Sequence, residues 1–316
     1  MISRILFAWS VALLFIFPGQ GFSQDIKVQS DSTDFRQGGM IAGMLNDSTQ
    51  DHSYRIRLEA KDGSSAASSE SFFDGSAHFF VLPLRFDLSP GEYKLRAVPL
   101  HLSGRQLKTV PVTVIQEEFP YQEISLTRQV SDVRRTIVPR RVEESEHLWS
   151  VISKVNLNAV HHRGPMQMPL DSYRVSSEFA HQRVFIYDDG TSDKSIHWGW
   201  DLAAPQGTPL FAPGSGRVVI ARDRIITGNS IIIEHLPGIF SLLYHLDSMY
   251  VQEGDVVSIG EVIGTVGTTG VSTGPHLHWE IRIRTIPVHP RYFLTIDILD
   301  TDLYLPHIGI DKPNYN

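Results

Sequence analysis

The segment that most constrains this chain runs from Gly274 to Arg282 and reads Gly-Pro-His-Leu-His-Trp-Glu-Ile-Arg. In a β-strand successive side chains point to opposite faces, so His276, His278 and Glu280 share one face. The other face carries only apolar side chains, those of Leu277, Trp279, Ile281 and Ile283. The pattern predicts a half-buried strand whose polar face presents two imidazoles. These are either two surface histidines or part of a metal site.

A second segment, His197-Trp198-Gly199-Trp200-Asp201, supplies a further imidazole and a carboxylate. The two segments together offer the ligand set of a catalytic zinc with one histidine to spare. The His-x3-Asp spacing would place both side chains on one helical face. However, the glycine between two tryptophans and the following Leu-Ala-Ala-Pro favour a loop that runs into a strand.

The sequence contains no HExxH motif, so a glutamate base of the thermolysin type is absent. Histidines must then supply the proton transfer that hydrolysis requires. The candidates are His245, in the segment Leu-Tyr-His-Leu, and whichever of His276 and His278 does not bind the metal.

The beginning of the chain predicts export. Arg4 precedes an apolar run from Ile5 to Phe17, and the small residues around Gly21 and Ser23 suit a signal peptidase. We therefore expect residues 1–23 to be a signal peptide that is removed. The run is shorter than a bilayer core, so no transmembrane span is expected after cleavage, and an uncleaved anchor is the alternative.

Cysteine is absent from the 316 residues. An exported chain without cysteine has neither disulfides nor a lipid-accepting cysteine, which predicts a periplasmic, extracellular or cell-wall location. The formal charge of −7 argues against nucleic acid or anionic lipid as the main partner.

The length predicts two domains, and the turn signals divide the chain accordingly. Residues 25–116 read as short strands and predict an Ig-like β-sandwich without catalytic groups. We expect this domain to be a spacer or to bind the cell wall or a protein. The sequence leaves open whether this domain covers the candidate metal site. Residues 165–300 predict a compact antiparallel sheet, with strand candidates at 217–221, 230–235, 240–245 and 276–284. Residues 301–316 form a tail.

Residues 117–164 are expected to be a linker that Pro120 and Pro139 interrupt. An amphipathic helix is predicted within it and packs on one of the two domains. Its apolar stripe consists of Leu148, Val151, Ile152 and Val155. The fold class is therefore mainly all-β with a helical connector.

The regular turns near residues 251–264 are also similar to those of biotinyl- or lipoyl-carrier domains. Such a carrier needs a lysine at a hairpin tip, and none occurs between Arg224 and Lys312. The carrier interpretation is therefore excluded.

Three motifs, His-x3-Asp, Tyr-His-Leu and Ser-Thr-Gly-Pro-His-Leu-His-Trp-Glu, resemble those of the lysostaphin- or LytM-type zinc metallopeptidases. The resemblance covers roughly residues 166–294 and implies a duplicated hybrid motif fold with one Zn²⁺ per chain in a groove. It implies His197, Asp201 and His278 as zinc ligands. It places His245 and His276 at the catalytic positions, one as general base and the other stabilising the tetrahedral intermediate. We favour His276 as the base.

The match also shows departures from the family. Its Phe-Gly-x-Arg segment is here Phe179-Ala180-His181-Gln182-Arg183, and a loop from Val184 to Ile196 is expected to rim the groove. Glu280 either fixes a histidine tautomer or is a solvated carboxylate. Tyr244, next to His245, is expected to point into the core.

The resemblance predicts a zinc endopeptidase that hydrolyses peptide bonds in the cross-links or stem peptides of peptidoglycan. An alternative from the same family is a non-catalytic module that activates another wall hydrolase. Such regulators typically lose ligands, whereas all five positions are filled here. A zinc peptidase that acts on secreted proteins is the third reading.

Overall fold

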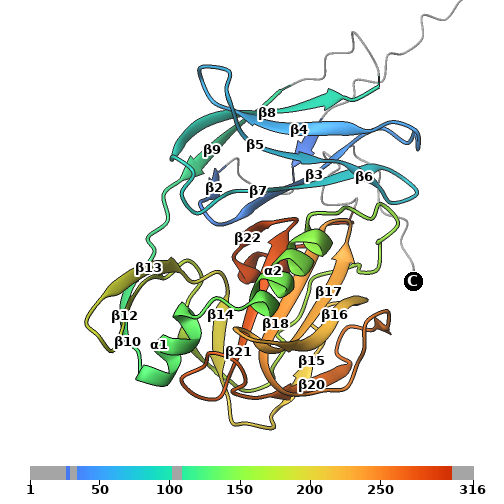
Figure 1. The fold of residues 1–316 in the computed structure, drawn as a ribbon. Helices are drawn as coiled ribbons and strands as arrows, with labels where there is room; N and C mark the ends of the chain where they lie inside the picture. The colour runs from blue at the N-terminus through green and yellow to red at the C-terminus, as the bar shows by residue number, and fades with distance from the viewer. Residues whose placement is uncertain (1–25, 29–33, 102–108, 301–316) are drawn as a thin grey trace, which may run out of the picture.

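The computed structural model describes residues 26–28, 34–101 and 109–300. The predicted signal peptide and the tail lie outside these residues. The described chain forms two β-rich bodies joined by a helical segment, as Figure 1 shows. The all-β prediction is confirmed.

The N-terminal body consists of two sheets. The first has the order β1-β3-β7-β6, with bounds Ile26–Val28, Met40–Leu45, His78–Pro83 and Phe72–Phe73. The second has the order β2-β9-β8-β4-β5, with bounds Asp34–Arg36, Val110–Ile115, Gly91–Pro99, Tyr54–Glu59 and Ser65–Glu70.

Strands β3 and β7 are buried along their whole length, unlike strands with one face in water. On β7, Phe80 packs in the core between the two sheets of the sandwich, whereas its neighbours Phe79 and Val81 pack against the C-terminal body. A strand that is covered on both faces reads as a continuous apolar run, which explains the sequence His-Phe-Phe-Val-Leu-Pro. The sandwich and the C-terminal body therefore share one hydrophobic core.

The C-terminal body is built on a ten-stranded sheet with the order β11-β14-β21-β18-β17-β16-β19, to which β15, β20 and β22 attach. The bounds along the main order are Arg174–Ser177, Trp200–Ala203, His276–Ile283, Ile239–Met249, Gly228–Leu236, Gly216–Arg224 and Val256–Val257. Those of the attached strands are Pro209–Phe211, Val262–Val266 and Ile286–Val288, and a short 3-10 helix follows at Pro290–Leu294. The four strand candidates of this region correspond to β16, β17, β18 and β21.

Helix α2 (Pro139–Ile152) lies across one face of this sheet, as seen in Figure 1. Leu148 and Ile152 pack there on Ile232 and Phe240, so the predicted helix packs as expected. The prediction that Pro139 interrupts the linker was wrong. This residue occupies the first helical position, where its missing N–H costs nothing, and it begins the helix instead of interrupting the segment. The helix ends at Ile152, so Val155, the last residue of the predicted apolar stripe, lies outside it.

The rest of the connector contains β10 (Tyr121–Ser125) and helix α1 (Arg128–Arg135). Strand β10 pairs in parallel with β12 (Gln182–Ile186), which pairs antiparallel with β13 (Ser192–Ile196). The loop expected from Val184 to Ile196 is therefore mainly a hairpin. Part of the connector belongs to the C-terminal body. Among the described residues no helix is long and apolar enough to cross a membrane.

Candidate metal centre

Three neighbouring elements bring the predicted ligands together. His197 directly follows β13, Asp201 lies on β14, and His278 lies on β21. Strands β14 and β21 are antiparallel neighbours in which Asp201 stands opposite His278. Residues directly opposite in such a pair project from the same face. The expected loop that runs into a strand between His197 and Asp201 is thus confirmed.

The three side chains converge on a small triangle. Nε2 of His197 lies 2.9 Å from Oδ1 of Asp201 and 2.9 Å from Nδ1 of His278. Nδ1 of His278 lies 2.8 Å from the same Asp201 oxygen. All three residues are buried, with at most 8% of their surface exposed.

The outer nitrogen of each imidazole indicates where its proton resides. Nδ1 of His197 donates to the carbonyl of Glu178 at 2.8 Å, and Nε2 of His278 faces Oε1 of Glu280 at 3.3 Å. Since these oxygens only accept, the neutral rings direct lone pairs at the triangle. Three electron-pair donors packed this closely can bind a cation between them, and the set of two imidazoles and one carboxylate suits zinc. The residues present therefore fit the metal that the resemblance implies.

The electrostatics of the cluster also favour a cation. Burial alone would lower the pKa of His278, but hydrogen bonds to Asp201 and Glu280 raise it to about 9. Burial would raise the pKa of Asp201, yet its bonds to His197 and His278 hold it well below its usual range. Two ionised carboxylates thus surround a single imidazole. A metal ion in the triangle can take the place of the proton on His278.

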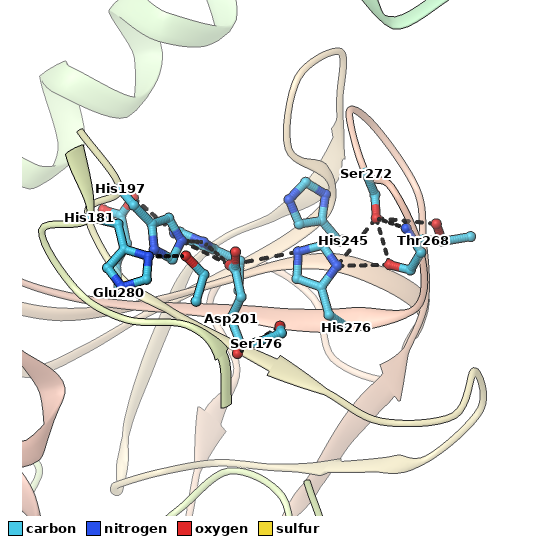
Figure 2. A network of polar contacts seen from close by, with 12 residues as sticks. Ser176, His181, His197, Asp201, His245, Thr268, Ser272, His276 and Glu280 are labelled. Carbon is cyan, nitrogen blue, oxygen red and sulfur yellow. Dashed lines mark hydrogen bonds and ion pairs between the residues drawn. The ribbon is translucent and has the colours of Figure 1, made fainter. Parts of the chain in front are cut away.

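The two remaining histidines lie beside the triangle. Nε2 of His276 is 3.7 Å from Oδ1 of Asp201, and the ring of His245 lies 4.8 Å from that of His276 between centroids. Figure 2 shows Asp201 between His197 on one side and the His276–His245 pair on the other. Nδ1 of His276 donates to the carbonyl of Gly274, and Nδ1 of His245 donates to that of Thr269, each at 2.8 Å. Both rings therefore keep an unprotonated Nε2.

The pKa values of both imidazoles are lowered from the ordinary value for histidine, which favours the neutral rings. Burial, reinforced by His276 and His278, lowers the pKa of His245 to about 3. Burial is also the main reason why the pKa of His276 is lowered. A neutral imidazole with a free nitrogen can accept a proton from water, as a general base must.

The expectation for Tyr244 was wrong in one respect. Its side chain does pack against α2, but its ring also stacks on His278, with centroids 5.4 Å apart and planes 8° from parallel. Tyr244 stands opposite His278 in the antiparallel pair of β18 and β21, so the two side chains project from the same face. The backbone of His245 has a φ of 63°, in the left-handed region, and this interrupts the alternation of β18. Neighbouring residues on that strand can then both reach the site.

Arg183 is the site residue that the sequence reasoning missed. Its Nη2 donates to Oδ2 of Asp201 at 2.7 Å and to Oγ of Ser177 at 2.8 Å. Arg183 thus binds Oδ2 of Asp201, while Oδ1 of the same carboxylate belongs to the triangle. The Phe-x-x-x-Arg segment was visible in the sequence, but spacing alone does not show which carboxylate the arginine meets.

With this geometry established, residues 195–290 match the family described as Peptidase family M23. That match contains the whole triangle and both neighbouring histidines. The C-terminal body that contains this match is called the M23 domain below.

Curated relatives agree over the same part of the chain. A DD-carboxypeptidase/endopeptidase Mpg from Neisseria meningitidis serogroup B is 43% identical over 39% of this chain and 27% of its own length. A peptidoglycan DD-endopeptidase ShyA from Vibrio cholerae is 38% identical over 40% of this chain and 29% of its own length. The matches thus span less than a third of either relative.

A crystal structure of a Pseudomonas aeruginosa protein assigned to peptidase M23 covers 82% of this chain and 93% of that chain, with a TM-score of 0.55. At a sequence identity of 22%, this match shows a shared fold alone, and its coverage extends that fold beyond the M23 domain.

The triangle and its two neighbouring histidines line a groove of about 510 Å³ in the M23 domain. One wall comes from the connector and the small sheet, through Gln122, Arg134 and Phe185 among others. The described part of the sandwich contributes no residue to the lining. It approaches the rim where Phe86 meets Trp198, with ring centroids 5.3 Å apart. The groove is therefore not covered by the described sandwich residues.

Proposed function

We propose that this protein is an exported zinc endopeptidase that hydrolyses peptide bonds in bacterial peptidoglycan. The observation that carries the proposal is the triangle of His197, Asp201 and His278 beside two neutral imidazoles in an accessible groove. The names of the Neisseria and Vibrio relatives support peptidoglycan as the substrate. The apolar first residues support export to the periplasm or cell wall.

His197, Asp201 and His278 would hold one zinc ion, which would supply the Lewis acidity that the hydrolysis of a peptide bond needs. The chain's own residues then manage the protons. His276, whose Nε2 is 3.7 Å from the triangle's carboxylate oxygen, accepts the proton of the attacking water at that nitrogen.

His245 acts on the other side of His276. Its Nε2 is free because Thr269 binds Nδ1. Once the proton that His276 took from water has passed to it, that nitrogen can donate a hydrogen bond to the oxygen on which charge develops, or that same proton to the leaving amine. A low pKa makes the protonated form a strong donor. The carbonyls of Thr269 and Gly274 keep the two rings oriented for this exchange.

The sandwich has a different role in the proposal. Because it shares a core with the M23 domain and leaves the groove open, we assign it to positioning the enzyme on the wall or on a partner protein. Its outer sheet, β2-β9-β8-β4-β5, faces away from the M23 domain, as seen in Figure 1.

The decisive experiment incubates the purified chain from Gln24 onward, loaded with zinc, with intact sacculi and with purified muropeptides. Mass spectrometry of the products then identifies the bond that is cut. We expect soluble peptide products, about one zinc per chain, and no products after removal of the metal with a chelator. A protein that binds zinc but leaves sacculi of several wall chemistries intact would instead be a non-catalytic activator.

A further inference from the structure

The wall of the groove next to β11 carries an arginine with no assigned role. Arg174 lines the groove at the start of β11, the edge strand of the large sheet. Its side chain is exposed. No carboxylate among the described residues forms an ion pair with it, whereas Arg183 in the same groove is paired with Asp201.

The sheet register fixes the direction of this side chain. Arg174 stands opposite Ala203 on β14, and Ala203 stands opposite His276 on β21. Residues directly opposite across antiparallel strands project from the same face, so the side chain of Arg174 leaves the sheet on the face of His276. Two strand spacings separate their Cα atoms by roughly 10 Å. The only side chain between them in this row is the methyl group of Ala203.

The other charges of the groove leave Arg174 as its free cation. The lining contains three arginines and two carboxylates. Asp201 belongs to the triangle and Glu280 is buried against Arg282. Arg134, the third arginine, stacks on Phe185 and lies 3.6 Å from Asp193. The groove is thus locally cationic in a chain whose formal charge is −7.

Further polar groups line the wall that the small sheet forms. Gln122 on β10 stands beside Arg183 on β12, and both line the groove. Oε1 of Gln122 and Nε of Arg183 are buried without a hydrogen-bond partner among the described residues. Buried polar atoms normally find a partner, so this wall is suited to meet polar groups of a ligand.

From this arrangement we propose that Arg174 anchors a free carboxylate of the substrate peptide within a residue or two of the scissile bond. The inference rests on the proposed function and narrows its substrate class to anionic peptides. A guanidinium binds a carboxylate with two parallel, charge-assisted hydrogen bonds, which fix the peptide's direction across His276.

The test compares two synthetic cross-linked stem-peptide dimers. In one the carboxylate next to the cross-link amide is free, and in the other it is a carboxamide. Calorimetry measures their dissociation constants with zinc-loaded His245→Ala protein, in which hydrolysis is slow, and with the same protein carrying Arg174→Gln. Arg128→Gln is the matched control, because Arg128 begins helix α1 and does not line the groove.

With Arg174 present, we expect the free carboxylate to bind about tenfold more tightly than the carboxamide. Arg174→Gln should remove this preference without changing the zinc content, and Arg128→Gln should retain it. A preference that survives in Arg174→Gln overturns the inference. The inference is also overturned if the protein that retains Arg174 binds both peptides equally well, or binds neither. Digestion of sacculi by the wild-type protein is scored separately, so failure of the proposed function is seen independently of the anion site.

Discussion

Oε1 of Glu280 lies 3.3 Å from Nε2 of His278, on the edge of the imidazole opposite the nitrogen that faces Asp201. The other carboxylate oxygen accepts from Nε of Arg282 at 2.6 Å. Glu280 is only 5% exposed, which excludes the alternative of a solvated strand carboxylate. Burial would raise its pKa, but Arg282 and His278 lower it to about 2, so it is ionised when it orients the ligand.

The first prediction concerns this orienting contact. Glu280→Gln keeps the shape of the side chain but removes the charge that polarises His278. Groups that orient a metal ligand typically change metal affinity by 10- to 100-fold, so we expect zinc affinity to fall by about tenfold. Competition with a chelator measures it. Glu143→Gln on the exposed face of α2 should leave the affinity unchanged. Equal affinities in the two variants would exclude the orienting role.

A second pair of substitutions separates metal binding from proton transfer. His278→Ala removes a vertex of the triangle and should abolish both bound zinc and hydrolysis. His245→Ala leaves the triangle intact, so it should retain the metal while hydrolysis falls by about 100-fold or more. Metal analysis and product release from muropeptides provide the two readouts. If His278→Ala retained full activity, the ligand assignment would be wrong.

The third prediction concerns the core shared between the sandwich and the M23 domain. Phe79 and Phe80 are adjacent and fully buried, but Phe79 packs against the M23 domain and Phe80 within the sandwich. Each substitution to alanine should cost about 3–5 kcal/mol. Phe79→Ala should also split a single unfolding transition into two, because it weakens the contact that couples the bodies.

Differential scanning calorimetry of the wild-type protein and both variants measures this coupling. Phe80→Ala serves as the control, since it removes the same volume on the other face of β7. Two separate transitions in the wild-type protein would show that the shared core does not couple the bodies.

The fourth prediction concerns pH and a histidine outside the metal site. His235 is fully buried, and burial is the main reason why its pKa falls to about 3. The unfolded chain binds a proton there near pH 6.5 while the folded chain does not, so the free energy of unfolding decreases as the pH falls from 6.5 toward 3. This one group should cost about 2 kcal/mol at pH 5 relative to neutral pH.

Urea unfolding at pH 7.5 and pH 5 of the wild-type protein and of His235→Asn isolates this effect. The difference between the two pH values should be smaller by about 2 kcal/mol in the variant. The exposed His101 provides the control, and His101→Asn should keep the wild-type difference. An unchanged difference in His235→Asn would contradict the assignment.

Much of the site could be predicted because its chemistry is local. Alternation along β21 separates His276 and His278 from the apolar side chains of their own strand. The glycine between two tryptophans favours a loop over a helix from His197 to Asp201. These features depend on a few consecutive residues and on the geometry of one strand, so they can be recognised without knowing what packs nearby.

Other features depend on contacts between distant segments. Arg183 meets Asp201 only because the hairpin β12–β13 folds back over β14. Tyr244 stacks on His278 because the register of β18 and β21 sets them opposite each other, and His245 joins them because its backbone takes a left-handed conformation. No propensity of a single residue indicates either result, since both follow from how neighbouring strands constrain the chain.

The sequence by itself determined the residues that can bind a metal and the strands that carry them, because side-chain chemistry and strand periodicity are local properties. Only the tertiary structure decided that the connector forms a wall of the groove and that the sandwich shares a core with the M23 domain. It also set Arg174 in one row with His276. These relationships depend on sheet register and on packing between segments far apart in the chain, where burial of apolar surface selects one arrangement among many.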